Sequence, residues 1–277
     1  MRGAAATLRH ELTGLAGVVE RNWYLVKRYA VWEVAWFVWT VANTLTIVFI
    51  AEGIEAAGGG IDVERQTTVL LIGAVIWSYL GILFEILTET VAWERWEGTI
   101  EYTFMAPLSR PVHLLGMGLF AVIYGLVRTA ALFGVIAAFF DLDLGRADFL
   151  AALVLLGVAS ISFLGIGMMT AVLPLISPEK GTQLGFIAQG ILLVVSGVYY
   201  SVEILPEWMQ WVATVSPATY ALRGIRAAIL DGAGVGALWG DVWPLLVIGA
   251  VSIPLGLAVF RRGEVYAKRH GKLKRSG

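Results

Sequence analysis

The sequence has no cysteine, few charged residues and only three histidines. Without cysteine, the chain can form neither a disulfide bond nor a thiolate metal site. The histidines, His10, His113 and His270, are scattered along the sequence and predict no shared metal site. The patterns G-x-x-x-x-G-K-[ST], H-E-x-x-H and G-x-S-x-G are also absent, which argues against P-loop ATP hydrolysis and two common hydrolase chemistries. We therefore expect a chain that is not an enzyme and that binds no metal and no cofactor.

The low charge content and the high hydrophobic content together indicate a membrane protein. Charged residues make up 15% of the chain, hydrophobic residues make up 58%, and the mean hydropathy is +0.77. In soluble domains, charged residues alone reach roughly a quarter of the composition. The net charge of −1 says little, because in a membrane protein the positions of the charges carry the information.

Long apolar runs predict six membrane spans. A hydrocarbon core about 30 Å thick requires about 20 mostly apolar residues per helix. The candidate runs are Val34 to Ile50, Thr67 to Phe84, Leu114 to Phe140, Phe149 to Ile176, Thr182 to Val202 and Val242 to Phe260. The first run becomes a full span if it is extended back through Glu33 to Ala30. Because the runs are continuous rather than alternating, we predict an all-α integral membrane protein with a six-helix transmembrane domain over residues 30–261.

The positions of Lys and Arg predict that both termini are cytoplasmic. Positive charges accumulate on the cytoplasmic side of membrane proteins. With both termini inside, 15 of these residues lie in the cytoplasm and 4 outside, while Arg128 lies within the third span. This topology places the polar segment from Glu94 to Arg110 and the turn from Ser177 to Gly181 in the cytoplasm. We expect a multi-pass protein of the cell membrane with a basic cytoplasmic tail over residues 262–277.

The N-terminal segment, residues 1–29, predicts an amphipathic helix rather than a cleavable signal. Arg9, His10 and Glu11 interrupt any apolar core that a signal peptide would need. Apolar residues instead recur at helical spacing: Leu8, Leu12, Leu15, Val19, Trp23 and Val26. Such a helix suits the inner membrane surface. The alternative is packing on the cytoplasmic ends of the protein itself, and the two are compatible.

The segment between the fifth and sixth spans is too apolar for an ordinary external loop. Pro206 and Pro217 suit the first turns of two short helices, each too short to cross a membrane. Its Trp and Tyr residues favour the membrane interface. We predict a re-entrant helical hairpin at about residues 204–231 that dips into the outer leaflet. A surface cap of two amphipathic helices is the alternative.

Arg128 is the one charge deep within a predicted span. An arginine there is costly unless it faces protein, water or a headgroup, so both a structural role and a role in a transport pathway stay open. Glu33 and Glu85 lie near the inner ends of their predicted spans and Glu203 near the outer end of its own, so none is expected at its depth. Tyr220, Arg223 and Arg226 in the external segment are further candidates. The two arginines suit anionic headgroups, or pairing with an acidic neighbour, Asp231 or Glu203.

Two motifs carry a resemblance to a known family. The first is Glu97, Gly98, Thr99, Ile100 and Glu101, followed by Ala106, Pro107, Leu108, Ser109 and Arg110. The second begins at Ser196 and Gly197 and runs through Leu205 and Pro206 to Pro217, Tyr220 and Arg226. With these motifs in this order, nearly the whole chain resembles the permease (transmembrane) subunit of a type-2 ATP-binding-cassette (ABC) exporter.

The resemblance implies a coupling helix at about residues 89–106 that docks in a groove of an ATPase subunit. Helical spacing adds an apolar ridge, Trp93, Trp96, Ile100 and Phe104, beside the carboxylates of Glu94, Glu97 and Glu101. Gly98 predicts a bend or a close backbone approach. A helix lying on the inner leaflet is the alternative. The expected coupling interface comprises Trp93, Glu94, Trp96, Glu97, Gly98, Thr99, Glu101, Pro178, Glu179 and Lys180.

The resemblance also implies a function and partners. The chain would pair with a second permease copy or a paralogue and with ABC ATPase subunits, which would hold the ATP and magnesium. It would export an amphipathic, lipid-like, drug or glycan substrate, and it would contact membrane lipid but no nucleic acid. The competing class is an ATP-independent ion-coupled transporter or an intramembrane enzyme. The absence of a carboxylate deep in the predicted spans argues against ion coupling.

Overall fold

The computed structural model describes residues 2–56, 63–140 and 144–273, and helices dominate these ranges without any strand. The helices are α1 (Arg2–Arg28), α2 (Ala30–Ala56), α3 (Val63–Glu97), α4 (Ile100–Met105), α5 (Arg110–Phe139), α6 (Phe149–Thr170), α7 (Val172–Ile176), α8 (Gly181–Val195), η1 (Val202–Ile204), α9 (Glu207–Ala213), α10 (Pro217–Leu230) and α11 (Trp239–Arg269). The predicted all-α class is confirmed. The last four residues of the predicted basic tail, 274–277, lie outside the described residues.

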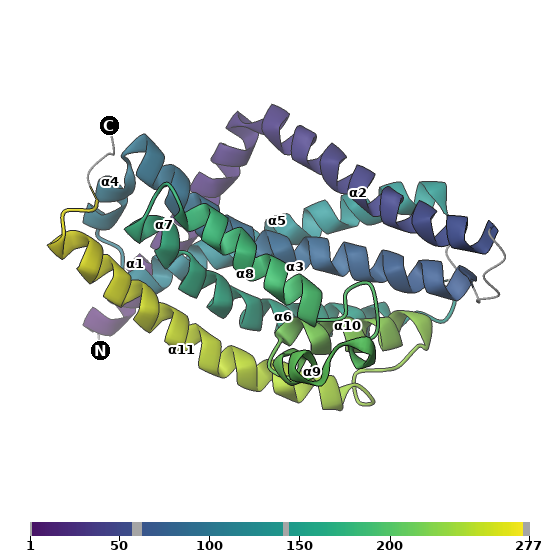
Figure 1. The fold of residues 1–277 in the computed structure, drawn as a ribbon. Coiled ribbons are helices and arrows are strands. Elements are labelled where there is room, and N and C mark those ends of the chain that lie inside the picture. Colours follow the sequence, from purple (N-terminus) through teal and green to yellow (C-terminus); the bar gives the residue numbers. More distant parts are fainter. Residues whose placement is uncertain (1, 57–62, 141–143, 274–277) are drawn as a thin grey trace.

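Helix α3 forms the centre of the bundle and packs against α5 and α6 (Figure 1). Two thirds of its most apolar stretch is buried, the largest share among the candidate spans of the described chain. The hydroxyls of Tyr79 on α3 and Ser160 on α6 lie 2.7 Å apart inside the protein. Helices α6 and α11 also pack closely. A Cβ on Gly165 of α6 would lie only 2.2 Å from the Ser252 hydroxyl of α11, so only a glycine fits there.

Five helices within the described residues are long and apolar enough to cross a membrane: Ala30–Ile50, Arg65–Glu97, Arg110–Phe139, Phe149–Ile176 and Trp239–Arg269. They correspond to five of the six predicted spans. The remaining prediction, the fifth span from Thr182 to Val202, is not confirmed. There α8 has 15 residues and therefore a length of about 22 Å, less than the hydrocarbon core.

The early end of α8 has a structural cause. Gly197 adopts a positive φ of 69°, which leaves the right-handed helical region. The hydroxyls of Ser196 and Ser216 then lie 2.7 Å apart, and Arg226 on α10 donates to the carbonyl oxygens of Gly197 and Val198. The chain after α8 is thus held back against α10 instead of extending the helix.

Both described ends of the chain lie at one end of the bundle, together with α4 and the turn between α7 and α8 (Figure 1). Helices α9 and α10 lie at the opposite end. This is the grouping of segments that the predicted topology requires.

Helix α1 packs on the protein along one face and leaves apolar side chains exposed along another. Val18 and Asn22 are buried, and a Cβ on Gly116 of α5 would come within 2.9 Å of Val18. The Nε2 atom of His10 lies 2.7 Å from the Pro107 carbonyl oxygen. Leu8 and Leu12 of the predicted apolar stripe stay exposed. The buried face thus packs on the protein itself, and the exposed apolar face is available for the membrane surface.

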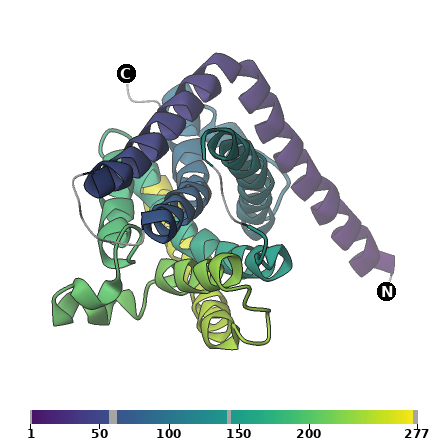
Figure 2. The same ribbon diagram turned by 90° about the vertical axis from the view of Figure 1, so that its right-hand side faces the viewer.

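Helix α2 is only loosely attached to the bundle. It meets α1 at a sharp corner and runs along the side of the other helices (Figure 2). Only 11% of its most apolar stretch is buried inside the chain, and Val31, Trp36 and Val38 are exposed. This helix is consequently one wall of an open space rather than part of the core.

The two short helices of the 204–231 segment begin where the prolines predict them. Pro206 directly precedes α9, and Pro217 is the first residue of α10. Helix α10 packs on α6 and α11, whereas α9 exposes Trp208 and Trp211.

Candidate functional site

A sharp helical elbow joins α3 to α4 at the end of the bundle that holds both termini. Gly98 has a φ of 75°, the Thr99 amide donates to the Glu94 carbonyl at 2.9 Å, and the Gly98 amide donates to the Arg95 carbonyl at 3.3 Å. This is the hydrogen-bond pattern of a glycine-terminated helix. The predicted bend at Gly98 is confirmed. The segment at about 89–106 is therefore not a single helix but the end of α3 followed by α4.

The elbow exposes a different set of side chains from the predicted ridge. Trp93 and Trp96 are more than half exposed, but Ile100 is fully buried in the core. Phe104 is half-buried, and the Cζ atom of Arg110 lies over its ring, 4.5 Å from the ring centre. The predicted ridge of Trp93, Trp96, Ile100 and Phe104 is wrong, because the turn at Gly98 breaks the helical register.

The outer surface of the elbow instead combines apolar and acidic groups. Tyr102 and Met105 on α4 are about 70% exposed and Trp96 is 65% exposed. Glu97 and Glu101 are also exposed. These five residues form the surface that we call the elbow face.

Glu94 does not belong to the elbow face, so the predicted flank of three exposed carboxylates is wrong for this residue. Its side chain is 2% exposed and pairs with Arg21 of α1 at 2.5 Å. A carboxylate buried in this way requires a partner of opposite charge. Glu94 therefore joins α3 to α1.

Arg110 fixes the position of α4. It donates to the carbonyl oxygens of Thr103 and Phe104 in the last turn of α4, where a helix leaves its carbonyls unpaired. Its Nε also lies 3.1 Å from Oε1 of Glu264 on α11, and Lys268 pairs with the same oxygen. The sequence motif contained Arg110 but gave no indication of Glu264, which is 154 residues away.

The turn between α7 and α8 lies at the same end of the bundle as α4 (Figure 1). Glu179 and Lys180 are exposed and Pro178 is half-buried. Gly181 packs against the backbone of Pro174, where a Cβ would come within 2.2 Å. The contact of this turn with a partner stays a prediction.

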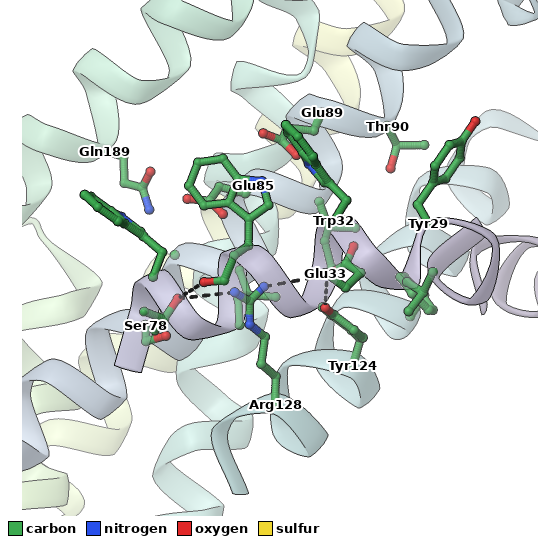
Figure 3. A pocket seen from close by; sticks show the side chains of 18 of the residues that line it. Tyr29, Trp32, Glu33, Ser78, Glu85, Glu89, Thr90, Tyr124, Arg128 and Gln189 are labelled. Carbon is green, nitrogen blue, oxygen red and sulfur yellow. Dashed lines mark hydrogen bonds and ion pairs between the residues drawn. The ribbon is translucent and has the colours of Figure 1, made fainter. Parts of the chain in front are cut away.

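A cavity of about 560 Å³ lies between α2, α3, α5 and α8, and the last turns of α1 close one end of its wall. Arg128 points into it from α5 (Figure 3). Its Nη1 lies 3.9 Å from Oε2 of Glu33 on α2, and its Nη2 donates to the Thr40 hydroxyl at 3.2 Å. Tyr124 donates a further hydrogen bond to Glu33. The expectation that Glu33 does not reach the depth of Arg128 is therefore wrong.

Two more carboxylates in this cavity were not recognised as site residues in the sequence. Glu85 and Glu89 lie one turn apart on α3, and Gln189 of α8 lines the same cavity. Because α3 continues as a helix to Glu97, these residues lie within it rather than at its end. Their spacing of four residues was the available signal, but the apolar run ended at Phe84.

The three candidates on α10 do not line the cavity and contact their own surroundings instead. The Tyr220 hydroxyl donates to the Thr214 carbonyl at 2.7 Å. Arg223 pairs with Asp241 on α11 at 2.6 Å rather than with Asp231 or Glu203. Arg226 holds the turn after α8. Their geometry shows how α10 is attached.

The long apolar helices make this chain a multi-pass membrane protein. Residues 18–230 match the ABC-2 type transporter family, and the chain belongs to this family. The members are transport permease subunits, which are not enzymes themselves.

Two curated relatives are similar to parts of the chain. The probable multidrug ABC transporter permease YbhR of Escherichia coli (strain K12) is 25% identical over 186 residues, which cover 66% of this chain and 49% of YbhR. The linearmycin resistance permease protein LnrN of Bacillus subtilis (strain 168) is 31% identical over 111 residues, 40% of this chain and 29% of LnrN. The matched region thus spans half or less of each relative.

Proposed function

We propose that this chain is the permease subunit of an ATP-driven exporter in the cell membrane, with both termini and the elbow in the cytoplasm. Family membership supports the permease role, and the names of the relatives place them among ABC transporters. The distribution of Lys and Arg supports the orientation. The energy would come from a separate ATPase subunit, because the sequence has no P-loop.

The elbow face is the proposed docking site for the ATPase, and it is the observation that carries the proposal. Three large apolar side chains are exposed at the elbow: Trp96 in the last turn of α3, and Tyr102 and Met105 on the short helix α4, whose backbone is fixed at both ends. Exposed aromatic residues of this kind serve as anchors in protein interfaces. Glu97 and Glu101 would face basic residues at the rim of the partner's groove.

The cavity is the proposed substrate route. Its volume of about 560 Å³ falls within the range of about 300–1,000 Å³ that is typical of sites for drug-sized ligands. The names of the relatives, multidrug and linearmycin resistance, support a drug-like amphipathic substrate. A second permease copy or a paralogue would cover the exposed side of α2.

Copurification and coupling test this function. We expect the cognate ATPase to copurify with the wild-type permease and to hydrolyse ATP faster when substrate is added. Charge reversal of the elbow face by Glu97→Lys with Glu101→Lys should abolish this association while the protein still inserts in the membrane.

Glu207→Lys provides the matched control, because Glu207 is an exposed carboxylate on α9 at the opposite end of the bundle. It should leave association unchanged. Unaltered substrate-stimulated ATP hydrolysis in the Glu97→Lys, Glu101→Lys double variant would contradict docking at the elbow.

One observation favours the second candidate function, ion-coupled transport without ATP. Glu33, Glu85 and Glu89 lie within the helical bundle, where ion-coupled transporters carry acidic groups. Transport in proteoliposomes distinguishes the two functions. Transport that proceeds with an imposed proton or sodium gradient and without ATP would support ion coupling.

A further inference from the structure

We infer that the cavity between α2, α3, α5 and α8 binds a bulky organic cation, an amphiphile with a positive charge on an apolar or aromatic body. This inference rests on the proposed function and names the substrate class that would use the cavity.

The charges that line the cavity do not balance. Five glutamates and two arginines contribute to its wall. Both arginines are already engaged, Arg21 with Glu94 and Arg128 with Glu33. Three carboxylates therefore remain without an ion pair among the described residues.

Two of these three carboxylates, Glu85 and Glu89, project from α3 into the space between α2 and α8 (Figure 3). Arg128 is near enough to act on both electrostatically, but its guanidinium is paired with Glu33. Gln189 is a neutral polar side chain that lines the same cavity. Carboxylates that are partly shielded from water gain from a partner of opposite charge, and among the described residues no cation other than Arg21 and Arg128 lines the cavity.

The third carboxylate, Glu97, lies at the elbow end of the cavity. Its partner there is the Tyr29 hydroxyl at 3.4 Å. Next to it, Oε2 of Glu94 is buried without a hydrogen-bond partner among the described residues. Because Glu97 also belongs to the elbow face proposed to meet the ATPase, the cation site itself rests on Glu85 and Glu89.

Indole rings provide the apolar part of the site. Trp32, Trp36 and Trp39 line the cavity from α2, and Trp77 and Trp93 line it from α3. The Trp32 and Trp36 rings meet nearly at right angles, 79°, with centres 6.2 Å apart. The face of an indole ring attracts cations, and its surface also accommodates an apolar body.

A metal ion fits this arrangement less well than an organic cation. No group of three or more His, Cys, Asp or Glu side chains within the described residues is arranged to hold a metal. The carboxylates are spread over α2 and α3, whereas a hard metal ion requires several oxygen ligands that converge on one point. The combination of dispersed carboxylates, tryptophans and a drug-sized volume favours a large cation with delocalised or shielded charge.

Two ions of nearly the same shape and opposite charge test this inference. Tetraphenylphosphonium and tetraphenylborate would each be measured by equilibrium dialysis against the purified complex of permease and ATPase in nanodiscs. Comparison of wild type with Glu85→Gln, Glu89→Gln in identical nanodiscs cancels partitioning into lipid. Correct folding of each variant is checked by its thermal midpoint and by size-exclusion chromatography.

We expect the double variant to bind tetraphenylphosphonium about tenfold more weakly than wild type, because two attractive charges are lost. Its binding of tetraphenylborate should stay unchanged or increase. Glu207→Gln, outside the cavity, should bind both ions like wild type. Equal effects of the double variant on the two ions, or no effect on the cation, would overturn the inference.

Failure of the inference and failure of the proposed function give different results. If a neutral or anionic amphiphile but no cation stimulates ATP hydrolysis and is transported, the exporter function stands and the cation site is refuted. If the elbow variant and ATP removal leave transport unaffected, the ATP-driven function is refuted. Charge-dependent binding of tetraphenylphosphonium would then still support the cation site.

Discussion

Two groups of glutamates within the same bundle differ in whether the protein neutralises them. Glu94 and Glu264 are buried and paired with Arg21, and with Arg110 and Lys268. Glu85 and Glu89 have no ion-pair partner among the residues that the structure describes. The first group joins α1, α4 and α11 to the rest of the protein. The second group lies in a cavity and is available to a ligand. The presence or absence of an ion pair therefore distinguishes carboxylates that stabilise the fold from carboxylates that can bind a ligand.

Glu264→Gln should have the largest effect on stability. The substitution leaves Arg110, whose side chain is only 20% exposed, without its counter-charge. Breaking a buried pair costs about 3–5 kcal/mol, and partial exposure reduces the expected loss here to about 2–3 kcal/mol. The thermal midpoint of the detergent-solubilised protein measures it. A midpoint equal to wild type would show that α4 does not need this link.

Glu94→Gln should have an intermediate effect. Its partner Arg21 is 38% exposed, so water stabilises the guanidinium when the carboxylate charge is lost. We expect a loss of about 1 kcal/mol in the same thermal measurement. A loss as large as that of Glu264→Gln would mean that α1 contributes more to the fold than its partial exposure indicates.

Glu85→Gln should have the smallest effect on stability. The isosteric amide keeps the shape of the side chain and removes a charge that has no ion-pair partner among the described residues. The thermal midpoint should therefore stay the same or rise slightly, while tetraphenylphosphonium binding weakens. A clear drop in the midpoint would assign Glu85 a structural role like that of Glu94 and would remove the contrast between the two groups.

Apolar runs in the sequence were sufficient to predict most long helices and the all-α class, but they placed the ends wrongly. The second predicted span stopped at Phe84 because Glu85 follows, whereas α3 continues for three more turns to Glu97. A charged residue ends an apolar run, but it does not end a helix when a cavity or an ion pair accommodates it. The pairing of Arg128 with Glu33 was missed for the same reason.

The elbow shows the opposite limit of sequence-based prediction. Gly98 was correctly predicted to bend the chain, yet the side chains were assigned to faces as if the helix were continuous. The positive φ at Gly98 changes the direction of the axis, so Ile100 enters the core while Tyr102 and Met105 become exposed. The predicted span from Thr182 to Val202 likewise ran through Gly197, whereas the positive φ of this residue and the contacts of Arg226 end α8 before it.

The bond between Arg110 and Glu264 has a mechanical consequence. A force applied to α4 is shared by two helices, α3 through the turn at Gly98 and α11 through this ion pair. Helix α6 would move with them, because its Gly165 lies in direct contact with Ser252 of α11. We therefore expect α3, α4, α6 and α11 to move together as one rigid body. The loosely attached α2 can shift relative to this rigid body, so we expect a force at the elbow to change the width of the cavity.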